Sequence, residues 1–180
     1  MGGPSPRWIE RWGWHQLDPV WAERLVDDAR VGPGDLVLDV GAGTGALTAP
    51  LLATGARVIA FEVHPGRAAQ LRERFGSELT LVRADARDLR LPRRPFHVVA
   101  SPPYAATNDL LRRLVHHGSR LQGAHLVLQA QAARRWAGAD APGARRWRSH
   151  LDAEVGRRLP RSAFRPAPRV DSRVLVLRRR

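Results

Sequence analysis

The 180-residue sequence contains no cysteine and no lysine, and it has a single methionine and a single tyrosine. Without cysteine, disulfide bonds and metal sites with thiolate ligands are excluded. No stretch approaches the roughly 18 consecutive apolar residues of a membrane helix, and the N-terminus lacks the apolar segment of a signal peptide. We therefore expect a cytoplasmic protein without a membrane partner, of a length that suits one compact domain.

Positive charge is the strongest feature of the composition. All 30 basic residues are arginine, against 17 acidic residues, which gives a net charge of +13. A GC-rich genome would explain the missing lysine, but not the excess of positive charge. Arginine side chains match phosphate oxygens and stack on bases, so the composition predicts a nucleic acid as partner.

Apolar runs typical of buried strands alternate along the chain with segments typical of helices. Helices are expected to follow Asp18 and Gly45, to open at Pro65, and to begin near Thr107. Strands are expected at 35–40, 57–62, 79–85, 96–101, 125–129 and within 170–180. This alternation predicts an α/β fold, with a parallel sheet and helices on both faces.

Two segments do not follow this pattern. Residues 1–17 contain three tryptophans and are expected to form a loose basic arm, followed by one domain over 18–180. The segment 134–150 combines five arginines with turn-forming residues. Part of it is therefore expected to be a mobile basic loop whose arginines contact RNA.

The first motif with chemical meaning is Asp39-Val40-Gly41-Ala42-Gly43-Thr44-Gly45, between the first strand and the next helix. Its glycines permit a sharp turn and a close approach of the backbone to a ligand. Gly41, Gly43 and Ala46 also fit a dinucleotide-binding pattern. Asp39 favours S-adenosylmethionine, because a carboxylate here would repel a pyrophosphate but attract ammonium and sulfonium groups.

Two acidic residues follow the next two strands, at the edge where such sheets bind ligands. Glu62 lies 21 residues after Gly41 and can accept hydrogen bonds from both hydroxyls of a ribose, in NAD as well as in S-adenosylmethionine. Asp85 can accept a hydrogen bond from the amine of the cofactor's adenine. Together they predict a ligand that contains adenosine.

The motif Ser101-Pro102-Pro103-Tyr104 ends the fourth strand. Its two prolines fix an extended loop and hold the flanking groups in place. An amine on an aromatic ring is a poor nucleophile, because its lone pair is delocalised. The Ser101 hydroxyl and the Pro102 carbonyl can bind the amine hydrogens and reorient that lone pair, while Tyr104 stacks on the base. A dehydrogenase has no use for this arrangement.

The last motif, F-x-P-x-P-x-V-x-S, begins at Phe164. With D-x-G-x-G-x-G, an acid after the second strand, A-D after the third and S-P-P-Y, all in this order, it makes residues 13–178 resemble the ribosomal RNA adenine N6-methyltransferases. That family includes the small-subunit adenine dimethylases and the erythromycin-resistance (Erm-type) methylases of 23S rRNA. The resemblance implies a Rossmann-like class I methyltransferase fold with a central, mostly parallel seven-stranded sheet.

The resemblance also assigns residues to two roles. For the target base, it implies that Ser101 and Pro102 hold the amine, and that Tyr104 and Phe164 enclose the flipped adenine. For the cofactor, S-adenosylmethionine, the implied binding residues are His15, Leu17, Asp39, Gly41, Gly43, Glu62, Val63, Asp85, Ala86 and Ser101.

Three features depart from the family's pattern. Trp14-His15-Gln16-Leu17 stands where many members have Q-N-F-L, Ser101 replaces the usual asparagine, and the helical domain after the last strand is missing. A short, arginine-rich chain looks most like the short actinobacterial resistance methylases. We therefore expect a monomer without a separate C-terminal RNA-binding domain, which methylates 23S rRNA once or twice and confers macrolide-lincosamide-streptogramin B resistance.

Four other functions remain open. They are a small-subunit rRNA adenine dimethylase, a DNA amino-methyltransferase, a non-catalytic rRNA-binding assembly factor and an NAD-dependent oxidoreductase. The last two motifs disfavour the DNA enzyme and the oxidoreductase. Methyl transfer from a sulfonium depends on positioning and electrostatics, and the sequence has no spacing typical of metal ligands, so no metal is expected.

Overall fold

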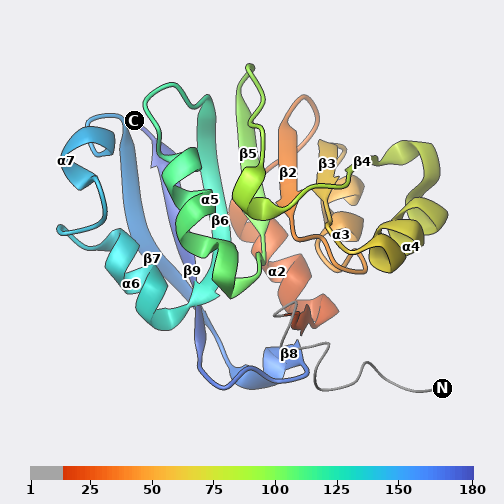
Figure 1. Cartoon of the computed structure of the whole chain (residues 1–180). Helices are drawn as coiled ribbons and strands as arrows, with labels where there is room; N and C mark the ends of the chain where they lie inside the picture. The colour runs from red at the N-terminus through yellow and green to blue at the C-terminus, as the bar shows by residue number, and fades with distance from the viewer. Residues whose placement is uncertain (1–13) are drawn as a thin grey trace.

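Seven strands form one sheet in the computed structural model, which describes residues 14–180 (Figure 1). In spatial order they are β4 (Thr80–Val82), β3 (Arg57–Phe61), β2 (Leu36–Val40), β5 (Phe96–Ala100), β6 (Leu121–Gln129), β9 (Ser172–Arg179) and β7 (Leu151–Leu159). Neighbouring strands from β4 to β6 are parallel, and β9 is antiparallel to both of its neighbours. The predicted α/β fold with a mostly parallel, seven-stranded sheet is therefore confirmed.

Helices cover both faces of this sheet, as the sequence predicts. They are α2 (Pro19–Ala29), α3 (Thr48–Ala53), α4 (Pro65–Phe75), α5 (Thr107–Leu114), α6 (Ala130–Ala137) and α7 (Ala144–Trp147). Short 3-10 turns occur at η1 (Gly76–Glu78), η2 (Ala86–Asp88), η3 (Tyr104–Ala106) and η4 (Arg161–Ala163). Among the helices of residues 14–180, none combines the length and the apolar character needed to cross a bilayer.

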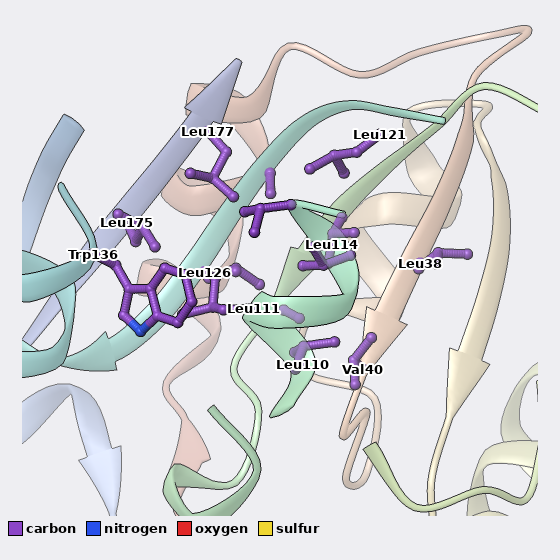
Figure 2. Packing of buried hydrophobic residues seen from close by; sticks show 14 of the residues in the cluster. Leu38, Val40, Leu110, Leu111, Leu114, Leu121, Leu126, Trp136, Leu175 and Leu177 are labelled. Atoms are coloured by element: carbon purple, nitrogen blue, oxygen red, sulfur yellow. The ribbon is translucent and has the colours of Figure 1, made fainter. Parts of the chain in front are cut away.

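Successive side chains of the central strands point into two separate apolar cores. Leu38 of β2 and Leu111 of α5 belong to one core, and Figure 2 shows the leucines of α5 packed between β2 and β6. Val37 of β2 and Leu25 of α2 belong to the core on the opposite face. Each fully buried side chain of this kind stabilises the fold by about 1.5–3 kcal/mol. The sheet is therefore a rigid support for the loops at its ends.

The segment 134–150, part of which was expected to form a mobile basic loop, contains the second half of α6 and all of α7, and the outer strand β7 follows it. Trp136 and Trp147 account for this order, because each is almost fully buried although it directly follows two arginines in the sequence. β7 was not predicted from the sequence. It is an edge strand with mixed burial and a bulge between Val155 and Arg158, so its sequence shows no clear apolar alternation.

The N-terminal arm was expected to extend to residue 17. Residues 1–13, with Trp8 and Trp12, lie outside the described part of the chain. Residues 14–17 are not loose: Gln16–Leu17 forms β1, which pairs with β8 (Phe164–Arg165) in a second, two-stranded sheet. The chain therefore brings these residues to the edge where the parallel strands end.

Candidate active site

A cavity of about 260 Å³ opens at the carboxyl edge of the parallel strands, which is the lower edge in Figure 1. Segments that follow β2, β3, β4 and β5 supply most of its wall, and the β1–β8 pair supplies the rest. The cavity is lined by all thirteen residues that the sequence singled out: His15, Leu17, Asp39, Gly41, Gly43, Glu62, Val63, Asp85, Ala86, Ser101, Pro102, Tyr104 and Phe164. Their individual roles remain predictions.

The glycine loop lies against the proline loop. Backbone N–H groups of Gly41 and Ala42 donate to the Phe61 carbonyl at 2.8 and 3.0 Å, which fixes the turn after β2. Gly41 has a φ of 76°, and a Cβ atom at this position would lie 2.9 Å from Cδ of Pro103. Only glycine allows this backbone conformation together with this approach. The two motifs are therefore in direct contact.

Asp39 is almost completely buried beneath the glycine loop. Its Oδ2 accepts a hydrogen bond of 2.7 Å from the Thr48 hydroxyl, whereas its Oδ1 has no hydrogen-bond partner within residues 14–180. Burial raises the pKa of Asp39 to about 7, and the nearby charge of Glu62 adds to the increase. A buried carboxylate with an unsatisfied oxygen is a place where a cationic ligand group would be stabilised.

Glu62 is the anchor of the loop that follows β3. Its Oε2 accepts from the Gly43 backbone N–H at 2.8 Å. Its Oε1 accepts from the His64 backbone N–H at 2.9 Å and from the Arg67 guanidinium at 2.9 and 3.1 Å. A carboxylate has about four acceptor sites, so a ribose bound here would share Glu62 with Arg67.

Two residues of this region were not predicted from the sequence. Arg67, on the first turn of α4, forms the buried ion pair with Glu62. Its guanidinium carbon also lies 5.3 Å from the ring centre of Trp14, and Trp14 Nε1 would lie 2.9 Å from a Cβ atom at Gly43. The basic residue shortly after Glu62 was the one available signal. Nothing local in the sequence places Trp14 against the glycine loop.

Asp85 lies at the start of η2 and is already paired within the chain. Its carboxylate accepts from the Arg87 backbone N–H at 2.9 Å and from the Arg87 guanidinium at 2.6 and 3.0 Å. The hydrogen bond from the Arg87 side chain holds the pKa of Asp85 below its usual range. Asp85 is therefore ionised at neutral pH and remains an acceptor, but Arg87 shares it.

Tyr104 is held in place at the end of the proline loop. Its hydroxyl and that of Ser172 are 2.9 Å apart and share a hydrogen bond, and burial raises the pKa of Tyr104 above its usual value. The ring of His15 lies 5.8 Å from the Tyr104 ring at an angle of 32°. Ser172 is the last residue of the F-x-P-x-P-x-V-x-S motif, so the structure gives this residue a contact that the motif alone did not.

The β1–β8 pair joins the start of the described chain to the segment before β9, beside the cavity. Leu17 lies opposite Phe164 in this pair, and both side chains are buried. The Asp18 N–H donates to the Ala163 carbonyl at 2.8 Å, and His15 Nδ1 lies 2.8 Å from the Pro166 carbonyl oxygen. These contacts explain how residues about 150 positions apart in sequence come to line one cavity.

The cavity offers aromatic, carboxylate and backbone groups rather than metal ligands. No cluster of three or more histidine, cysteine or acidic residues suited to a metal ion occurs within residues 14–180. Cationic, sugar and aromatic parts of an organic ligand all find suitable groups in the wall.

Comparisons with known sequences give the same family throughout. The family model for ribosomal RNA adenine dimethylase matches residues 16–180. An rRNA adenine N-6-methyltransferase of Corynebacterium diphtheriae is 36% identical over 146 residues, which cover 79% of this chain and 57% of that protein. A ribosomal RNA small subunit methyltransferase A of Synechococcus sp. is 36% identical over 194 residues, which cover 97% of this chain and 67% of that protein. The chain thus spans between half and about two thirds of the length of these relatives.

The fold has a similar match among solved structures. The crystal structure of the 23S rRNA methyltransferase ErmE aligns with a TM-score of 0.79 at 28% identity, covering 91% of this chain and 68% of that one. This match and the strand order confirm the Rossmann-like class I methyltransferase fold expected from the motifs. On the extent of the family match and the two relatives at 36% identity, the chain belongs to the ribosomal RNA adenine dimethylase family.

Proposed function

We propose that this chain transfers a methyl group from S-adenosylmethionine to N6 of an adenine in 23S rRNA. The observation that carries the proposal is the direct contact between the glycine loop and the proline loop at Gly41 and Pro103. A cofactor held by the first loop and an amine held by the second would be neighbours. Holding two reactants in this way can lower the barrier by about 7–11 kcal/mol.

The cofactor part of the proposal rests on the chemistry of the wall. The unsatisfied Oδ1 of Asp39 suits an ammonium group, and the carboxylate of Glu62 suits ribose hydroxyls. Asp85 would accept from the adenine amine. When bound, S-adenosylmethionine supplies a methyl group on a sulfonium, and S-adenosylhomocysteine is the leaving group.

The acceptor part rests on the proline loop. The Ser101 hydroxyl and the Pro102 carbonyl oxygen accept the two hydrogens of N6 and turn its lone pair towards the methyl group. Tyr104 offers one face for stacking, with Phe164 as its predicted partner on the other side of the flipped adenine. Methyl transfer first gives a cationic N6-methyl amine. Because this cation is acidic, it releases its proton to solvent, and no side chain of the wall has to act as a base.

The choice of 23S rRNA and of macrolide-lincosamide-streptogramin B resistance follows the likeness of this arginine-rich sequence to the actinobacterial resistance methylases. The similarity to the Synechococcus small-subunit methyltransferase makes small-subunit rRNA the second candidate. In both cases the partner is RNA, in keeping with the net charge of +13.

One experiment separates these targets. The protein is incubated with labelled S-adenosylmethionine and naked 23S rRNA, 16S rRNA or double-stranded DNA, and the label is mapped by primer extension and mass spectrometry. We expect label at N6 of one adenine in 23S rRNA, and reduced macrolide sensitivity in a bacterium that expresses the chain. Label confined to 16S rRNA or to DNA would overturn the target, and absence of label from all three would overturn the activity.

A further inference from the structure

A second cavity lies at the opposite, amino edge of the sheet, outside the proposed methyl-transfer site. It is an open depression of about 910 Å³ between the segment before β5, the end of α5 and the turn before β6. Five arginines and one histidine line it: Arg90, Arg93, Arg112, Arg113, Arg120 and His116. None of the residues that line it within 14–180 is acidic.

The frame of this depression is held by arginines that bond to backbone carbonyls. Arg113 donates to the carbonyls of Arg87 at 2.8 Å and of Leu89 at 3.5 Å, which ties the segment before β5 to α5. Arg179, near the end of β9, donates to the Leu121 and Ser119 carbonyls at 2.7 and 2.8 Å. The shape of the depression is therefore set by the fold, not by a ligand.

Three other arginines at the rim do not donate to backbone carbonyls in this way. The side chains of Arg90, Arg93 and Arg120, here called the amino-edge arginines, are exposed and form no hydrogen bond or ion pair with residues 14–180. The ion pairs of Arg112 with Asp109 and of Arg113 with Asp88 are long, at 3.6 Å, and exposed. Exposed pairs of this kind contribute little, so a phosphate could replace either acid at small cost.

We propose that this depression binds backbone phosphates of the RNA substrate at a point remote from the methylated adenine. Guanidinium groups around an open, acid-free depression match phosphate oxygens, and such contacts carry affinity without reading sequence. The five residues of β5 separate the two edges by roughly 17 Å at about 3.3 Å per residue. A folded RNA can therefore contact both edges at once. The partner class rests on the proposed function, whereas the anion site rests on the geometry alone.

The test compares two triple variants with equal loss of charge. Arg90→Gln/Arg93→Gln/Arg120→Gln removes the amino-edge arginines. The control, Arg24→Gln/Arg30→Asn/Arg72→Gln, removes three exposed arginines on α2, its C-cap and α4. Asparagine is chosen at position 30 because Arg30 has a left-handed φ of 52°, which asparagine tolerates.

Binding to naked 23S rRNA is measured by fluorescence anisotropy between about 50 and 200 mM salt, without methyl donor. For the amino-edge variant we expect affinity to fall on the order of tenfold and the log–log salt slope to decrease by about 2–3. Calorimetry with S-adenosylhomocysteine should show unchanged cofactor binding in both variants. An unchanged slope, or an equal change in the control, would overturn the site.

The two proposals fail in different ways. If the salt slope of RNA binding decreases in the amino-edge variant as expected, but the wild type places no methyl group on rRNA, the phosphate site is supported and the proposed activity is wrong. If the wild type methylates 23S rRNA and the amino-edge variant keeps the wild-type slope and KM for RNA, the activity stands and the depression falls.

Discussion

The two edges of the parallel sheet use their polar groups in opposite ways. At the carboxyl edge, Glu62 accepts hydrogen bonds from Arg67 and from backbone N–H groups, and Tyr104 shares a hydrogen bond with Ser172. At the amino edge, the side chains of the amino-edge arginines are exposed and form no hydrogen bond or ion pair within the described part of the chain. A preorganised edge recognises a ligand of defined shape, whereas an exposed cationic edge acts through attraction that salt screens.

Substitution Asp39→Asn should produce the largest effect, because it removes a buried charge from the preorganised edge. The pKa of Asp39 is raised to about 7 in the folded protein, against about 4 in an unfolded chain. The folded protein therefore keeps a proton that the unfolded chain releases, and the wild type should lose stability as pH rises from about 4 to 7. The asparagine carbonyl can still accept from Thr48 and carries no charge.

Thermal unfolding of both proteins between pH 4 and pH 8 measures this difference. Above about pH 7 the variant should be more stable by at most about 4 kcal/mol, and near pH 4 the two should agree. Binding of S-adenosylhomocysteine should weaken in the variant, since its ammonium loses the carboxylate. A stability difference that does not change with pH would show that burial does not raise the pKa of Asp39.

Substitution Gly41→Ala tests whether the two loops must touch. The new methyl group would meet Pro103 at 2.9 Å and Pro102 Cα at 3.5 Å, and a displacement of about 1 Å can cost on the order of 100-fold in rate. Gly34→Ala is the matched control, because Gly34 also has a positive φ, of 91°, but a Cβ atom there meets nothing within 4 Å. Turnover near that of the control would show that methyl transfer does not depend on contact between the two loops.

Substitution Tyr104→Ala tests the aromatic wall of the cavity. Loss of one stacked base contact, about 1–3 kcal/mol, should lower kcat/KM by roughly 5- to 150-fold. Tyr104→Phe keeps the ring, loses the hydrogen bond to Ser172 and should be affected by only a few-fold. Cofactor binding and the salt slope should not change in either variant, in contrast to the amino-edge variant. Equal activity of the alanine and phenylalanine variants would exclude stacking.

Substitution Ser101→Asn should have the smallest effect, on the number of methyl groups added. A second transfer requires the monomethylamine to bind through its one remaining N–H. The short serine hydroxyl should hold it less well than an amide carbonyl, and a loss of about 1 kcal/mol slows that step several-fold. We therefore expect mostly monomethyladenine from the wild type and more dimethyladenine from Ser101→Asn. Mass spectrometry of digested rRNA decides, and mainly dimethyladenine from the wild type would contradict the idea.

The sequence predicted the elements that have strong local signals. α4 was expected from Pro65 to about Phe75 and has these bounds, because proline at the first turn and an apolar stripe define it locally. β7 and the order of α6 and α7 were not foreseen, since their burial depends on contacts with β9 and on Trp136. These contacts are tertiary, and the local arginine-rich composition obscures them.

In the candidate site, too, local features were predictable and tertiary contacts were not. Motifs and the family resemblance predicted thirteen of the residues that line the cavity, because most of the motifs follow a strand and carry their chemistry in a few positions. The bonds between motifs were not predictable: the ion pair of Glu62 with Arg67 and the position of Trp14 against Gly43 depend on how α4 and the N-terminal segment pack. The comparison with relatives identifies the family but does not supply these contacts.

The β1–β8 pair has a consequence for how the cavity opens. It contains two residues in each strand, whereas β6 and β9 share a seven-residue register. Local unfolding begins where few hydrogen bonds hold a segment, so this pair should separate before the sheet does. Amide hydrogen exchange should then be fast at Leu17 and Phe164 and slow at Leu126 and Val176. Transient separation on this scale would let a nucleotide enter past His15 and Phe164 without any movement of the glycine loop.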